Sequence, residues 1–219
     1  MNIFEKKIIA ITGPSGAGKS TLGEKLIKNY DISVPQHCTT RTRRNDDIDG
    51  FYRYLNHDEY RYLYDNGQFF ISSGDGPVVK KEYGNFYGVL VDDLLLSLKN
   101  SNMIILYVSY RDINTLVSLK EIGYDIDIVV LTYENIVEGI KSRLFNNVKR
   151  NHTEEDINKR ILNAIELDNT HRELINRYAR CIIYTDKLNI EETYEMVCNN
   201  LELCNKKKKQ LLKGEKIHD

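Results

Sequence analysis

The sequence predicts an α/β fold in which helices cover both faces of a parallel sheet. Short apolar segments alternate with helical segments through most of the 219 residues, an order that is typical of parallel strands joined by crossover helices. The first apolar segment, KIIAIT at residues 7–12, is followed by a glycine-rich loop and a helical pattern. Residues 33–90 are rich in Tyr, Gly, Asp and Arg instead, and they predict a small α+β insertion on the core.

The core elements can be placed in order along the chain. Residues 7–12 are largely β-branched and end at a glycine, as expected of a buried strand, and residues 20–29 carry leucine and isoleucine on one helical face. Thr153 and the three acids after it have the form of a capping box that opens a long helix. The other expected core elements are strands at 103–108, 127–132 and 181–184 and helices at 92–99, 113–121, 134–146, 154–178 and 190–204.

The insertion and the C-terminal tail complete the predicted organisation. The elements expected in the insertion are a strand at 51–55, a helix at 58–65 and a turn at 74–77. One domain is predicted over residues 1–204, with its core at 1–32 and 91–204 and the insertion at 33–90. The lysine-rich residues 205–219 are expected to form a basic tail.

Composition excludes several classes of protein. The formal net charge of −1 gives no excess of positive charge that would indicate nucleic-acid binding. Cys38, Cys181, Cys198 and Cys204 form no CxxC pair and indicate free thiols in a reducing compartment. No apolar stretch reaches membrane length, and the one near the N-terminus is too short for a signal peptide. We expect a soluble, cytoplasmic protein that binds neither nucleic acid nor membranes; nothing in the sequence indicates its oligomeric state.

The glycine-rich loop GPSGAGKS, residues 13–20, fits the phosphate-loop pattern G-x-x-x-x-G-K-[ST] at every fixed position. Its glycines let backbone amides turn toward an anion, Lys19 can reach the β- and γ-phosphates, and the Ser20 hydroxyl can bind Mg²⁺. The sequence therefore predicts the P-loop NTPase fold and a site for ATP with Mg²⁺. The residues expected to form this site are Gly13, Ser15, Gly16, Ala17, Gly18, Lys19, Ser20 and Thr21.

Missing residues exclude two other kinds of nucleotide-binding enzyme. A GTPase needs an NKxD sequence to read guanine, and the chain has none. A motor or transporter ATPase is longer and has an acid at the end of an apolar strand, whereas the strand at 103–108 ends in Tyr107, Val108 and Ser109. The small size and the insertion favour a kinase for a small molecule, which closes over its substrates to exclude water.

Three segments resemble the guanylate kinase family: TTRTRR at 39–44, DDIDGFY at 46–52 and GNFYG at 84–88. The family carries a TTRxPR segment, an acidic turn with glycine and tyrosine, and later a GNYYG segment, in the same order. The resemblance extends from about residue 7 to residue 200. It implies a three-layer P-loop NTPase core, an insertion that binds a nucleoside monophosphate, and a short lid at about residues 146–153.

The acceptor phosphate is the first group to which the resemblance assigns residues. Arg41 and Arg44 offer two guanidinium groups suited to a dianionic phosphate. Tyr52 and Tyr87 could each donate a hydroxyl hydrogen bond to the same phosphate. By resemblance, these four side chains hold the acceptor phosphate.

The lid region supplies further cations. Arg143 and Arg160 match arginines of the family on either side of its lid, and Lys149 or Arg150 stands for a lid arginine. The resemblance implies that Arg143 and Arg160 act catalytically with Lys19 and Arg41, by stabilising charge on the transferring phosphoryl group.

The residues that read the base depart from the family. Guanylate kinases use a glutamate where this chain has Ile71, Ser72 and Ser73, and His37 replaces a serine that helps to read the base. The family also carries acids at the end of a core strand, where this chain has Tyr107 and Ser109. A buried carboxylate discriminates strongly between bases, because a wrong base leaves it unpaired. We expect Ser72 or Ser73, together with His37, to line the acceptor site as weaker readers of the base.

This pattern leaves three functions open. The first is transfer of the ATP γ-phosphate to a nucleoside monophosphate, with GMP or dGMP as the default acceptor. The second is the same chemistry on a phosphorylated sugar, because ribose 1,5-bisphosphate kinases are similar to guanylate kinase and lack the same base-reading groups. The third is a non-catalytic binding module, against which the intact Lys19 and Ser20 argue.

Overall fold

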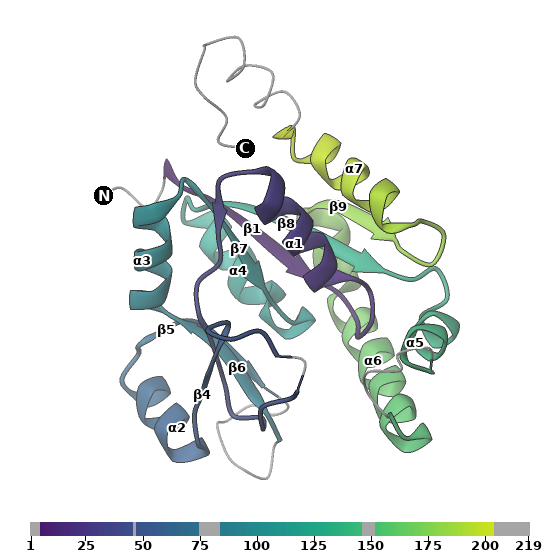
Figure 1. The fold of residues 1–219 in the computed structure, drawn as a ribbon, viewed down its shortest axis with the longest axis horizontal. Coiled ribbons are helices and arrows are strands. Elements are labelled where there is room, and N and C mark those ends of the chain that lie inside the picture. The colour runs from purple at the N-terminus through teal and green to yellow at the C-terminus, as the bar shows by residue number, and fades with distance from the viewer. Residues whose placement is uncertain (1–4, 46, 75–83, 146–151, 204–219) are drawn as a thin grey trace.

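The computed structural model describes residues 5–45, 47–74, 84–145 and 152–203. Figure 1 shows a central sheet with helices around it and a smaller sheet with one helix at its lower end. Lys149 and Arg150 of the expected lid, and the expected tail at 205–219, lie outside the described residues. None of the helices in the described ranges combines the length and the apolar character needed to span a membrane.

The central sheet has five strands in the order β2-β7-β1-β8-β9, and every neighbouring pair is parallel. The middle strand β1 is buried over its whole length after Lys7, because strands pack on both sides of it and helices cover both faces. The α/β fold expected from the sequence is confirmed. The strands are β1 (Lys7–Thr12), β2 (Ile32–Ser33), β7 (Met103–Tyr107), β8 (Asp125–Thr132) and β9 (Ala179–Tyr184).

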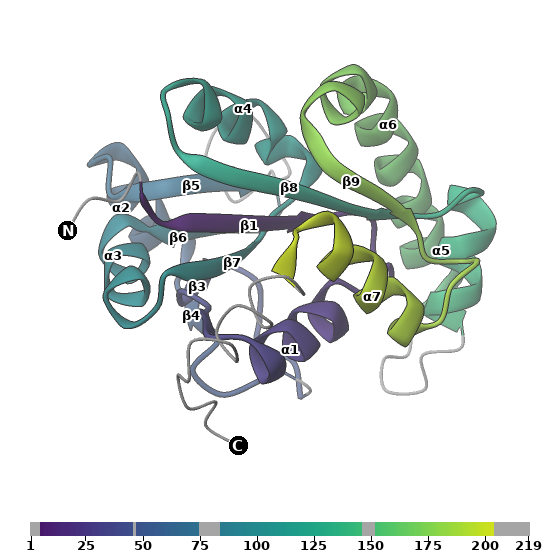
Figure 2. The ribbon, with the colours of Figure 1, turned by 90° about the horizontal axis from the view of Figure 1, so that it is seen from above.

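Helices on the two faces of this sheet bury separate cores. One face carries α1 (Lys19–Asn29), α5 (Ile136–Phe145) and α7 (Ile190–Asn200), and its core includes Ile9 and Leu22. The other face carries α3 (Val91–Asn100) and α4 (Ile113–Glu121). The long helix α6 (Glu154–Tyr178) contributes to both cores. Figure 2 shows α1 and α7 on one side of the sheet and α4 and α6 on the other, which completes three layers.

The inserted residues form a second sheet in the order β4-β3-β6-β5. The helix α2 packs on it through Tyr60, which is fully buried with Cys38 and Phe86. The strand β6 leads directly into α3, so no loop separates the insertion from the core on this side. The elements of the insertion are β3 (His37–Thr39), β4 (Tyr52–Tyr54), α2 (His57–Asp65), β5 (Phe69–Gly74) and β6 (Phe86–Leu90).

Local contacts explain where element ends differ from the sequence expectation. The helix expected at 134–146 begins at Ile136, because the Asn135 side chain accepts hydrogen bonds from the amides of Val137 and Glu138. The strand expected at 127–132 begins at Asp125, where it pairs with Lys7 of β1. The helix expected at 190–204 is α7, which ends at Asn200.

Candidate active site

The phosphate loop lies between the end of β1 and the start of α1. Gly13 has φ 141°, and a Cβ placed there would lie 1.9 Å from the Leu131 carbonyl oxygen of β8. Gly18 has φ 89° and precedes the first turn of α1, which has no side-chain cap. The first amides of α1 are therefore left for an anion at the positive end of the helix.

Lys19 lies at the centre of this loop. Its Nζ donates hydrogen bonds to the carbonyl oxygens of Gly13 at 2.6 Å and Pro14 at 2.8 Å. Burial lowers the pKa of Lys19 to about 8. A phosphate bound in the loop would give this ammonium group an anionic partner in addition to the two carbonyl oxygens. The loop and Lys19 therefore fit a nucleoside triphosphate, and Ser20, exposed in the first turn of α1, could bind its Mg²⁺.

Two arginines approach the loop from the helices on either side of residues 146–151. Arg160 of α6 donates a hydrogen bond from Nη1 to the Ser15 hydroxyl at 3.1 Å. Arg143 of α5 packs its Cβ against Gly16 and donates from Nη2 to the Thr185 carbonyl at 2.9 Å. Both expected cations thus border the phosphate loop, but only Arg160 lines the cleft described next.

A cleft of about 850 Å³ opens between the two sheets. Its walls come from the phosphate loop, the inserted sheet, the end of β7 and one face of α6. The cleft therefore connects the donor side, where the loop lies, with the insertion, where an acceptor is expected. The sequence-predicted residues that line it are Gly13, Ser15, Lys19, His37, Arg44, Tyr52, Tyr87 and Arg160.

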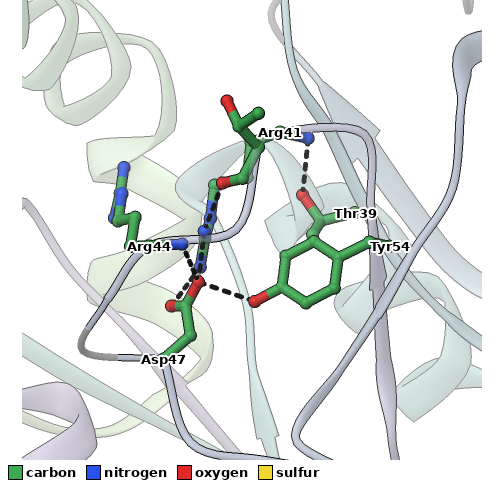
Figure 3. Close-up of polar contacts among 6 residues, drawn as sticks. Thr39, Arg41, Arg44, Asp47 and Tyr54 are labelled. Atoms are coloured by element: carbon green, nitrogen blue, oxygen red, sulfur yellow. Dashed lines mark hydrogen bonds and ion pairs between the residues drawn. The ribbon is translucent and has the colours of Figure 1, made fainter.

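Arg41 is placed differently from Arg44. Its Nη1 and Nη2 donate to the two carboxylate oxygens of Asp47, each at 2.6 Å, and its guanidinium group lies 4.6 Å from the centre of the Tyr52 ring. Figure 3 shows Asp47 between Arg41 and Tyr54, whose hydroxyl also donates to the carboxylate at 2.6 Å. The structure thus gives Arg41 an internal anion as its partner.

Asp47 also fixes the backbone that carries Arg44. Its Oδ2 accepts a hydrogen bond from the Arg44 amide at 2.7 Å, while Figure 3 shows the Arg44 side chain pointing away from Asp47. Hydrogen bonds from Arg41 hold the pKa of Asp47 well below its usual range, despite burial. Sequence reasoning missed Asp47, although the acidic turn after Arg44 was the signal that could have identified it.

His37 belongs to the wall of the cleft. Its Nδ1 donates to the Pro35 carbonyl at 2.9 Å, and its Nε2 accepts from the Tyr107 amide at 3.3 Å. The ring stacks on Phe51 at 5.1 Å. Burial lowers the pKa of His37 to about 4, so the ring is neutral at pH 7. His37 lines the cleft, but both of its ring nitrogens are hydrogen-bonded to the protein backbone.

The two serines of β5 lie on opposite faces of the inserted sheet. Ser72 forms a 2.9 Å hydrogen bond with the hydroxyl of Tyr60 in the core of the insertion, and it does not line the cleft. Ser73 lines the cleft and donates to Asp112 at 3.2 Å. Successive side chains of a strand alternate between faces, so only one of the two serines can face the cleft. That serine is Ser73, and the placement of Ser72 at the acceptor site is wrong.

Comparisons with known proteins agree with this architecture. The sequence profile of the guanylate kinase family matches residues 5–202. A guanylate kinase of Clostridium perfringens is 28% identical over 95% of this chain and 83% of its own length. A guanylate kinase of Mycoplasmopsis pulmonis is 29% identical, and that match spans 49% of this chain and only 53% of the relative.

A solved structure shows the same fold. The crystal structure of guanylate kinase from Anaplasma phagocytophilum superposes with a TM-score of 0.64, at 20% identity, over 90% of this chain and 85% of that one. The family profile covers nearly the whole described chain, and the phosphate loop that the family requires is intact. The chain therefore belongs to the guanylate kinase family, and it is a phosphotransferase of the nucleoside monophosphate kinase type.

Proposed function

We propose that this protein transfers the γ-phosphoryl group of ATP to the phosphate of a nucleoside monophosphate, with GMP or dGMP as the preferred acceptor. One observation carries the proposal. Lys19 and Arg160 on the donor side and Arg44 on the acceptor side line the same cleft. Each end of the cleft thus offers positive charge to a phosphate, and the two phosphates can meet between them.

The acceptor end suits a phosphate monoester. Arg44 supplies a guanidinium group, and Tyr52 and Tyr87 line the same cleft. Arg41, held by Asp47, supports the ring of Tyr52 and the loop that carries Arg44. Arg41 is therefore proposed to act chiefly by positioning these groups.

The donor end suits the triphosphate of ATP. The loop amides and Lys19 bind its phosphates, and Ser20 would hold Mg²⁺, which neutralises charge on the β- and γ-phosphates when bound. An oxygen of the acceptor phosphate forms a bond to the γ-phosphorus, and the bond to the β–γ bridging oxygen breaks, so ADP leaves. No protein base is required, because the acceptor oxygen is already anionic. Lys19 and Arg160, which line the cleft, stabilise the charge that spreads over the transferring group.

A panel of acceptors tests this function. ADP release is measured with MgATP and, in turn, GMP, dGMP, AMP, CMP, UMP and ribose 1,5-bisphosphate. We expect release with GMP and dGMP. Release with the sugar alone would overturn the proposal in favour of the sugar kinase, and the cleft-lining Arg111 is the observation that favours that alternative, since it adds a cation for a second phosphate.

The binding-module alternative has a separate test. An equilibrium titration with MgATP is expected to show binding, and an absence of binding would favour a non-catalytic module. The cytoplasm is the proposed location. It is supported by the described cysteines, Cys38, Cys181 and Cys198, which form no disulfide with one another.

A further inference from the structure

Asp112 is a buried carboxylate that lines the cleft and that the proposed chemistry has not used. It ends the short 3₁₀ turn Tyr110–Asp112, which follows β7. The residue is only 4% exposed, yet it belongs to the cleft wall together with Ser73 and Ser109. Residues 107 and 109 are not acids, and this acid lies three residues beyond Ser109.

The two oxygens of this carboxylate have different surroundings. Oδ2 accepts hydrogen bonds from the Ser109 amide at 2.7 Å and from the Ser73 hydroxyl at 3.2 Å. Among the residues that the structure describes, none donates to Oδ1, and none forms an ion pair with the carboxylate. One oxygen is thus held in place by the protein, and the other is left as an acceptor.

The contact with Ser73 joins the two parts of the site. Ser73 belongs to β5 of the inserted sheet, close to the position at which guanylate kinases carry the glutamate that reads guanine. Asp112 belongs to the core and reaches the same place from the end of β7. Burial raises the pKa of Asp112 to about 6, so the group is mostly ionised above pH 7 and gains from any further hydrogen-bond donor.

We propose that Asp112 reads the base of the acceptor nucleotide, with Oδ1 accepting hydrogen bonds from the ring N1–H and the 2-amino group of guanine. The inference rests on the proposed function and specifies its acceptor. It supplies the carboxylate that is missing from residues 71–73 and 109. Adenine presents a lone pair at N1 and no 2-amino group, so a carboxylate disfavours it.

A structural role for Asp112 has to be separated from this one. The hydrogen bond from the Ser109 amide to the Asp112 carboxylate closes a capping box on the 3₁₀ turn. Loss of this hydrogen bond would disturb the turn whatever the acceptor. Asp112→Asn keeps an oxygen for the Ser109 amide and the Ser73 hydroxyl, and it places an NH₂ group where Oδ1 was. The variant therefore preserves the cap and inverts the hydrogen bonding offered to the base.

The test measures kcat/KM for GMP, IMP and XMP in the wild type and in Asp112→Asn. IMP lacks the 2-amino group, and XMP carries an oxygen in its place. We expect the wild type to prefer GMP over IMP about tenfold or more. In Asp112→Asn, kcat/KM for GMP should fall about tenfold or more, the preference over IMP should disappear, and XMP should improve relative to GMP.

Asp127→Asn is the matched control. Asp127 is also buried, at 7% exposure, and it pairs with Lys7 at 2.6 Å at the opposite end of the sheet from the phosphate loop. That variant should keep the GMP preference whatever its stability. If Asp112→Asn folds and keeps the wild-type preference for GMP, the inference is overturned and the proposed function stands. If the wild type itself uses no nucleoside monophosphate, both are overturned.

Discussion

Arg41 and Asp47 form a two-pronged ion pair inside the inserted subdomain, with both N–O distances at 2.6 Å. Their side chains are 6% and 5% exposed, and Asp47 also accepts from Tyr54 and from the Arg44 amide. The pair sets the shape of the loop that presents Arg44 to the cleft. Its chief effect is therefore on the geometry of the acceptor site.

Asp47→Ala should lower the free energy of unfolding by about 3 kcal/mol, because it leaves the Arg41 guanidinium buried without its partner. Urea unfolding followed by circular dichroism measures the change. The same variant should raise the KM for the acceptor, since Arg44 loses its backbone support.

The control for Asp47 is Asp49→Ala. Asp49 pairs with Arg43 at the same sequence spacing, but these side chains are 92% and 55% exposed. Solvent screens such a pair, so the urea midpoint should barely move. Equal effects of the two substitutions would show that burial does not govern the Arg41–Asp47 pair.

Arg44→Ala should raise the KM for the acceptor about tenfold or more while changing the KM for ATP little, because Arg44 lines the acceptor end of the cleft. Steady-state kinetics with each substrate varied in turn give both constants. Arg43→Ala is the neighbouring control, and it should change neither, since that side chain is exposed and paired with Asp49. A larger rise for Arg43→Ala than for Arg44→Ala would reverse the assignment.

Lys19→Ala should reduce kcat about 10²–10³-fold or more, because it removes the buried ammonium group from the phosphate loop. ADP release under saturating substrates measures the loss. Lys25→Ala on the same helix is the control, since Lys25 is paired with Glu191 outside the cleft. Comparable activity of Lys19→Ala and wild type would remove the loop from the mechanism.

His37 should make the protein less stable in acid. Its pKa in the folded protein is about 4, below its usual 6.5, so the unfolded chain binds a proton between these values and the folded chain does not. The neutral His37 ring therefore contributes about 3 kcal/mol to the free energy of unfolding. This stability is complete above pH 6.5 and is lost as the pH falls to 4.

The measurement for His37 is the free energy of unfolding at pH 7.5, 6, 5 and 4 for wild type and His37→Phe. Phenylalanine can keep the stacking on Phe51 but does not titrate. The difference between wild type and variant should shrink with falling pH. Asp112, whose pKa is raised to about 6, changes the free energy of unfolding in the opposite direction as the pH falls. It does so in both proteins, so its effect cancels when the variant is subtracted from the wild type. Parallel curves would contradict the buried neutral histidine.

The sequence was sufficient for the parts of the site that depend on local order. The phosphate loop could be predicted from the fixed spacing of its residues alone, because its glycines, Lys19 and Ser20 are neighbours within one short loop. The parallel sheet follows from alternating apolar and amphipathic segments. The start of α6 follows from Thr153, whose side chain does accept from the Asp156 amide.

Contacts between distant segments could not be predicted in the same way. The register of β5 against β6 shifts between Phe69 and Ile71, and this irregularity decides whether Ser72 or Ser73 faces the cleft. The presence of Asp112 in the cleft wall was missed because this residue lies in the turn beyond β7. The pairing of Arg41 with Asp47 depends on how the loop between β3 and β4 folds back on itself.

The central claim is that one cleft holds both phosphates in line for transfer. A bisubstrate analogue that joins adenosine and guanosine through a pentaphosphate tests it directly by calorimetric titration. We expect it to bind about 10²-fold or more tightly than either ATP or GMP, with the gain lost in both Lys19→Ala and Arg44→Ala. Affinity no greater than that of the tighter single nucleotide would contradict the claim.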